Sequence, residues 1–152
     1  MGTVYEDITI KNAGDTVILE KGLIREQDVH EITVNAIVDT GAMSLVINED
    51  ICKALGLSIQ GERYARVANG QRVHCKITEP VEIHWKDRST ACQAVVIPGA
   101  ESVLLGAIPL EGMDLMVDPV NRKLVGVHGN QVELMILAIS ANHPQGTAGL
   151  YV

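Results

Sequence analysis

The chain has 152 residues, the length of one ordinary domain, and 47% of its side chains are hydrophobic, which is ample material for a core. Its 19 acidic residues outnumber the 12 basic ones and give a formal net charge of −7, which disfavours binding to nucleic acid or to an anionic membrane surface. There are 18 valines, 15 isoleucines and no phenylalanine, a β-branched composition that favours a sheet-rich protein.

Targeting and cysteine signals are weak. The N-terminal residues lack a basic region followed by an apolar run, so we expect no signal peptide, and the apolar stretch 134–139 is too short to span a bilayer. Cys52, Cys75 and Cys92 are odd in number and no pair has C-x-x-C spacing, which predicts neither a disulfide framework nor a zinc site. The scattered histidines have no metal-ligand spacing. We therefore predict a cytoplasmic protein with no metal and no cofactor.

Apolar runs bounded by turn residues predict a mostly β chain. In chain order, the expected strands are 4–10, 16–19, 31–38, 45–47, 64–68, 71–77, 81–85, 91–97, 102–106, 115–117, 123–127 and 132–139. Two short helices are expected, at 48–56, where Asn48 can cap the N-terminus and Gly56 suits the C-terminus, and at 108–113. Asn69-Gly70 predicts a hairpin with a type I′ turn, since both of its central residues would need positive φ. Residues 1–140 are predicted to form one domain, and 141–152 a loose tail.

A short internal sequence repeat indicates a duplicated unit. The sequence Gly-Ala-Met-Ser-Leu-Val at 41–46 resembles Gly-Ala-Glu-Ser-Val-Leu at 99–104. Each copy follows an apolar strand and precedes a predicted short helix. This arrangement predicts two strand–loop–strand–helix units related by a pseudo-two-fold axis.

The tetrapeptide Asp39-Thr40-Gly41-Ala42 is the sharpest chemical feature. An acid at the end of an apolar strand is costly to bury unless it has a partner or a use, because burial disfavours the ionised carboxyl. Gly41 lets the backbone approach that carboxyl and donate its N–H, and Thr40 offers a hydroxyl that can tie one loop to a neighbour. The tetrapeptide alone is equally consistent with a turn in which Asp39 caps its own backbone.

The surrounding sequence resembles the retropepsin-like, or retroviral-type, aspartic proteases of the pepsin clan, in a single-domain prokaryotic-type form. The features that carry the resemblance are the apolar strand before Asp39, the short helix after it, the Asn69-Gly70 hairpin where that family has its flap, and Val-Leu-Leu-Gly at 103–106. They extend from about residue 32 to residue 127. The resemblance implies an all-β fold, a closed β-barrel or sandwich with two short helices and internal pseudo-two-fold duplication.

The resemblance also implies roles for individual residues. Asp39 would be the catalytic carboxylate, Thr40 would form a hydroxyl–backbone lock between two acid loops, and Gly41 would contact substrate through its backbone. The residues that would bind substrate are Ala42, the flap tip Asn69 and Gly70, and the pocket residues Ser102 and Leu104. One departure concerns the segment after Gly106, which reads Ala-Ile-Pro-Leu where retroviral enzymes usually carry Arg-Asp or Arg-Asn. An inter-subunit lock made by that arginine is not expected here.

Catalysis of this kind needs two carboxylates that share one proton, and the chain has a single Asp-Thr-Gly. Asp114 and Asp118 lack that context and are expected to be a solvated residue and a turn residue. The sequence therefore predicts a homodimer that hydrolyses polypeptides between two Asp39 carboxylates, with 132–139 as the expected interface strand. The alternative is a catalytically inactive retropepsin-fold β-domain that serves as a dimerisation or peptide-binding module.

Overall fold

The structure is a computed structural model that describes residues 2–134 and 136, and the predicted tail 141–152 lies outside them. The helices and strands, in chain order, are β1 (Val4–Asn12), α1 (Ala13–Glu20), the 3₁₀ turn η1 (Glu26–Asp28), β2 (Glu31–Val38), β3 (Leu45–Ile47), α2 (Glu49–Ala54), β4 (Ile59–Arg66), β5 (Arg72–Trp85), β6 (Arg88–Val96), β7 (Val103–Leu105), α3 (Ala107–Gly112), β8 (Leu115–Asp118) and β9 (Lys123–Gly126). No helix among the described residues is long and apolar enough to cross a membrane.

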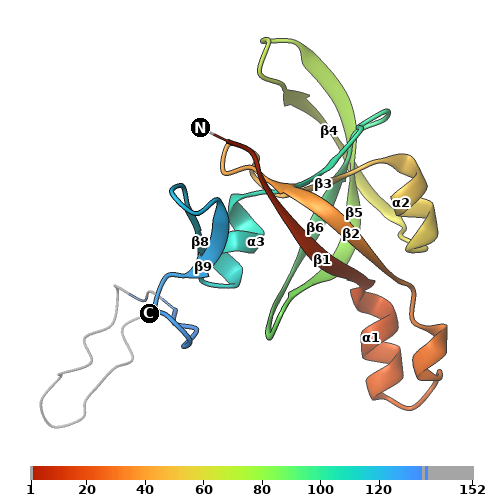
Figure 1. The fold of residues 1–152 in the computed structure, drawn as a ribbon. Helices are drawn as coiled ribbons and strands as arrows, with labels where there is room; N and C mark the ends of the chain where they lie inside the picture. The colour runs from red at the N-terminus through yellow and green to blue at the C-terminus, as the bar shows by residue number, and fades with distance from the viewer. Residues whose placement is uncertain (1, 135, 137–152) are drawn as a thin grey trace, which may run out of the picture.

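Six strands form a closed barrel. The sheet has the order β1-β2-β7-β3-β6-β5-β4, and an additional pairing of β1 with β5 joins its two sides (Figure 1). Within residues 2–134 and 136, β4 pairs only with β5, and the two strands extend beyond the barrel as a hairpin, while β8 and β9 form a separate two-stranded sheet. The predicted fold class, mostly β with a closed barrel, is confirmed.

The barrel interior is filled mainly by β-branched and leucine side chains. The largest fully buried side chains of the protein are Ile8, Ile10, Leu45, Ile47, Leu55, Ile83, Leu105 and Met113. Branched side chains stand well on a pleated surface, and their modest size fills a narrow barrel without phenylalanine. β2 turns one face toward this core, since Ala36 is buried and Ile32 and Val34 pack against it.

The predicted duplication is present in the strand pairings. β2 pairs in parallel with β7, Ala36 opposite Val103, and β6 pairs in parallel with β3, Ala94 opposite Leu45. A constant shift of 58 positions converts the first pairing into the second, and the same shift carries α2 onto α3. The two units therefore exchange strands about a pseudo-two-fold axis that passes between β3 and β7, which pair antiparallel.

Three secondary-structure predictions were wrong. Residues 16–19, expected as a strand, lie in the helix α1, because the Asn12 side chain accepts a hydrogen bond from the Asp15 N–H and caps a helix that begins at Ala13. The part of the chain that the structure describes therefore has three α-helices instead of the two expected. Residues 132–134 and 136 are not in a strand, and the rest of the predicted strand 132–139 lies outside the described residues.

The third error concerns the flap turn, whose hairpin was predicted correctly. The Gly70 N–H bonds to the Val67 carbonyl at 2.9 Å, so the central residues of the turn are Ala68 and Asn69. Only Gly70 has positive φ, +84°, and the Val67 N–H bonds to the Gln71 carbonyl. A three-residue loop with a left-handed glycine replaces the predicted type I′ turn.

Candidate active site

The acid loop, residues 39–44, connects the end of β2 to β3. The Asp39 N–H donates to the Leu105 carbonyl at 3.0 Å, so the loop begins while the chain is still paired with β7. The Gly41 N–H donates to Asp39 Oδ1 at 2.9 Å, as predicted, and the Ala42 N–H donates to the Asp39 carbonyl at 3.0 Å. These bonds hold the carboxylate in one orientation. Asp39 is only half-buried in the single chain.

Backbone hydrogen bonds from the start of α3 hold the acid loop in place. The N–H groups of Ala107 and Ile108 donate to the carbonyls of Ala42 and Met43, both at 2.8 Å. A Cβ added to Gly106 would lie within 3.0 Å of the carbonyl oxygens of Ser44 and Ala42, so only glycine allows this approach. The predicted motif of two hydrophobic residues and a glycine thus has a structural role. The use of the following amides as supports for the acid loop was not predicted.

A shallow hollow lies beside the Asp39 carboxylate. It is lined by the N-terminal residues Gly2, Thr3 and Val4, by Ile37, Val38, Asp39 and Thr40, and by Val117 and Pro119. Thr40 is exposed, and its hydroxyl makes no hydrogen bond within the described part of the chain. The three residues predicted to form the catalytic loop, Asp39, Thr40 and Gly41, therefore lie together at the surface of a single chain.

The second loop, residues 97–102, has the same backbone connections as the acid loop but no acid at the position of Asp39; its one acidic residue, Glu101, stands where the acid loop has Met43. The Ile97 N–H donates to the Ile47 carbonyl at 3.0 Å, just as the Asp39 N–H donates to Leu105. The Ala100 N–H donates to the Ile97 carbonyl at 3.1 Å, matching the Ala42 bond to Asp39. Ile97 therefore occupies the position that corresponds to Asp39 in the other unit. A single chain therefore supplies a carboxylate at this position in only one of its two loops.

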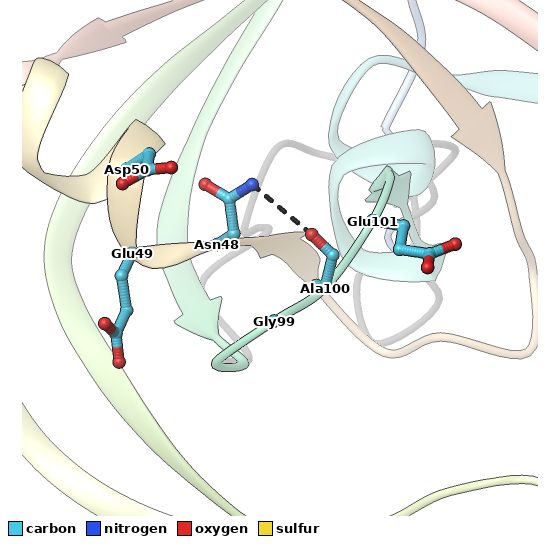
Figure 2. Close-up of a pocket in the computed structure, with 6 residues that line it drawn as sticks. All are labelled: Asn48, Glu49, Asp50, Gly99, Ala100 and Glu101. Carbon is cyan, nitrogen blue, oxygen red and sulfur yellow. Dashed lines mark hydrogen bonds between the residues drawn. The ribbon is translucent and has the colours of Figure 1, made fainter.

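The carboxylates nearest the second loop do not replace the missing acid. Figure 2 shows the hollow between this loop and the start of α2, where Asn48 Nδ2 donates to the Ala100 carbonyl at 3.3 Å. Glu49, Asp50 and Glu101 line the hollow, but their carboxylates point in different directions. They do not converge on a shared proton or a shared water.

The remaining predicted substrate residues lie at different distances from the acid loop along the strands. Leu104 is half-buried and pairs with Ile37 of β2, two residues before Asp39. Ser102 is exposed and precedes β7, and since β7 runs parallel to β2, it lies at the opposite end of this pair from Asp39. Asn69 and Gly70 form the exposed tip of the β4–β5 hairpin.

Asp118 is a turn residue, as predicted, and Asp114 is not solvated. Asp118 Oδ1 accepts the N–H groups of Val120 and Asn121. Asp114 is 8% exposed and accepts bonds from His128 Nδ1 at 2.8 Å and from the Glu133 N–H at 3.0 Å. The His128 hydrogen bond lowers the pKa of Asp114, and the same bond raises the pKa of His128. The backbone of Asp114 has a φ of +55° just after α3. Gly56 has a similar φ, +61°, at the corresponding position after α2.

The three cysteines are free and lack the features of a nucleophile. Burial raises the pKa of each of the thiols of Cys52, Cys75 and Cys92, so the neutral thiol is favoured. Within residues 2–134 and 136, no group of three His, Cys, Asp or Glu residues is arranged to hold a metal ion. The chemistry available at this site is that of the Asp39 carboxylate.

Comparison with known proteins gives the family. A family model described as gag-polyprotein putative aspartyl protease matches residues 26–111, more than half of the chain. The chain belongs to this family. Among solved structures, EIAV protease complexed with the inhibitor HBY-793 is similar, with 24% sequence identity and a TM-score of 0.42 over 49% of this chain and 70% of that one. A comparison with curated proteins gave no match.

Proposed function

We propose that this protein is an aspartic endopeptidase that is active as a homodimer. The observation that carries the proposal is that a chain of an aspartyl protease family has two pseudo-symmetric loops, of which only one has an acid at the Asp39 position, while the other has Ile97 there. Two carboxylates are required because one must be ionised and the other protonated. A second copy related by a two-fold axis supplies the missing carboxylate.

The geometry of the acid loop supports this role. One oxygen of Asp39 is held by the Gly41 N–H, and the other has no hydrogen-bond partner among the described residues. Thr40 and Gly41 are exposed beside it, as residues that meet a partner loop would be. Dimerisation would complete the burial of Asp39, which a single chain leaves half-buried.

The reaction follows from two adjacent carboxylates. Like charges a few ångströms apart disfavour double ionisation, so the pair holds one proton and titrates as a unit. The ionised Asp39 takes a proton from water, whose oxygen attacks the peptide carbonyl carbon, while the protonated Asp39 gives its proton to the carbonyl oxygen. The tetrahedral intermediate collapses as the C–N bond breaks and the amine leaves with a proton from the dyad. Extended polypeptides with apolar side chains at the cut are the proposed substrates.

The decisive test is Asp39→Asn, assayed against an unfolded protein at mildly acidic pH. We expect the variant to keep its fold and its dimer, because asparagine still accepts the Gly41 N–H, and to lose about 10²–10⁴-fold in kcat/KM. The wild type should be blocked by a statine-type inhibitor.

Cleavage retained by the asparagine variant would refute the assignment. A wild type that dimerises and binds peptide but never cleaves would instead support the alternative, a peptide-binding module.

A further inference from the structure

The β4–β5 hairpin carries a concentration of positive charge in an acidic protein. Residues 59–78 contain four of the 12 basic residues of the chain, Arg63, Arg66, Arg72 and Lys76, but only one of its 19 acidic residues, Glu62. The hairpin thus bears a net charge of about +3 within a chain of −7. It extends from the barrel at the end of the molecule opposite α1 (Figure 1).

Strand register gathers most of these charges on one side of the hairpin. Glu62 lies opposite Lys76, Tyr64 opposite His74, and Arg66 opposite Arg72. Paired residues share a face of an antiparallel sheet, and these alternate with Ala65, Val73 and the buried Cys75 on the other face. We call the first side the cationic face; its residues are Glu62, Tyr64, Arg66, Arg72, His74 and Lys76.

Tyr64 orients the charges at the centre of the cationic face. Tyr64 is 65% exposed, the Arg72 guanidinium lies 4.4 Å from the centroid of its ring, and the His74 ring packs edge-on against it with 5.5 Å between the ring centroids. A guanidinium stacked on an aromatic ring keeps its in-plane N–H groups available for a planar anion. Stacking also reduces the conformational freedom that binding would otherwise remove.

The two arginines of the cationic face have no acidic partner within the described part of the chain. Arg66 donates one N–H to the Gly70 carbonyl at 2.9 Å, which leaves four of the five N–H donors of its guanidinium. The carboxylate of Glu62 lies 3.6 Å from His74, and among the described residues the one arginine–carboxylate ion pair is Arg25 with Asp28. Guanidinium groups without an acidic partner suit carboxylates, which they bind in bidentate geometry.

We propose that the cationic face binds acidic polypeptide segments, so that the favoured substrates carry Asp or Glu side chains beside the apolar stretch that enters the active site. The substrate part of this inference rests on the proposed function, whereas the binding part does not. Positive charge on the hairpin complements such a segment, and the acidic remainder of the protein repels it elsewhere, which directs it to the hairpin.

The test compares labelled peptides that share an apolar centre and differ only in their flanking residues, which are Glu, Gln or Lys. Binding is measured by fluorescence anisotropy to the Asp39→Asn variant at about pH 6, where glutamate is ionised. We expect the Glu peptide to bind about tenfold more tightly than the Lys peptide, and this ratio to shrink when NaCl is raised to about 0.5 M. Cleavage by the wild type should follow the same order.

Charge variants assign the effect to the hairpin. The double variant Arg66→Glu with Arg72→Glu should abolish or reverse the preference for the Glu peptide over the Lys peptide. The neutral double variant Arg66→Gln with Arg72→Gln should reduce this preference. The matched control is Lys21→Glu with Arg25→Glu, which changes the total charge equally at the α1 end and should leave the order intact.

Equal affinity for the three peptides would overturn the inference. A preference for the Glu peptide that survives in the Arg66/Arg72 variants, or that is lost in the control variant, would overturn it as well. Ordered binding without cleavage would refute the proposed protease instead.

Discussion

Gly106 is the residue on whose size the acid loop depends most directly. Gly106→Ala places a Cβ against the carbonyl groups of Ser44 and Ala42, which are backbone atoms and cannot rotate away. We expect the free energy of unfolding to fall by about 1–3 kcal/mol, as in other overpacked sites, and kcat/KM to fall as well because the acid loop shifts. Urea denaturation and peptide cleavage measure the two effects.

Gly61→Ala is the matched control for this substitution. Gly61 lies in β4, and a Cβ at this position would have a flexible arginine nitrogen as its nearest neighbour, at 3.7 Å. This variant should retain wild-type stability. Equal stability of the Gly106 and Gly61 variants would contradict the close approach of α3 to the acid loop.

At the scale of elements, the Asp114–His128 pair joins the end of α3 to the segment after β9. The pKa of His128 is raised from its ordinary value of 6.5, so the contribution of His128 to stability is complete below that pH and is lost as the pH rises through the raised pKa. The pKa of Asp114 is lowered from 3.8, so its contribution is complete above that pH and is lost as the pH falls through the lowered pKa.

We therefore expect the stability difference between wild type and His128→Gln to be largest between about pH 4 and 6.5 and smaller at about pH 8. Urea midpoints across this range measure it. The double variant with Asp114→Asn supplies the cycle that isolates the coupling between the two side chains. A coupling that did not change between about pH 5 and 8 would argue that the two groups do not titrate together.

Helix α1 illustrates how context decides an element. Thr16, Val17 and Ile18 are β-branched and favour a strand in isolation. The adjacent strand β1 already pairs with both β2 and β5, so no sheet edge is open to them. Asn12 caps the helix instead and donates its amide to the Leu55 carbonyl at 2.9 Å, which ties α1 to the end of α2.

At the scale of the whole molecule, a shared active site predicts a mixing effect. If two Asp39 carboxylates form one site, equal amounts of wild type and Asp39→Asn, exchanged to equilibrium, leave about one quarter of the dimers fully wild type. Activity should fall to about one quarter of that of the same total amount of wild type. The measurement is cleavage rate after co-incubation, with sedimentation to confirm that the subunits exchange.

Independent chains would give a different result. Each wild-type molecule would then keep its own activity, and the mixture would retain about one half. Activity of one half together with a monomer by sedimentation would exclude the shared site, even if each protein behaved as expected on its own.

The sequence by itself determined the strands of the barrel, the helices α2 and α3, the duplicated unit and the acid loop with its Gly41 bond. These features depend on local signals: periodicity, caps, turn residues and a repeated hexapeptide. Tertiary structure decided the helix α1, the burial of Asp114 and the seating of the acid loop on Gly106 and the α3 amides. Each of these depends on which distant segment lies alongside, and strand pairing in a closed barrel sets that only when the whole chain has folded.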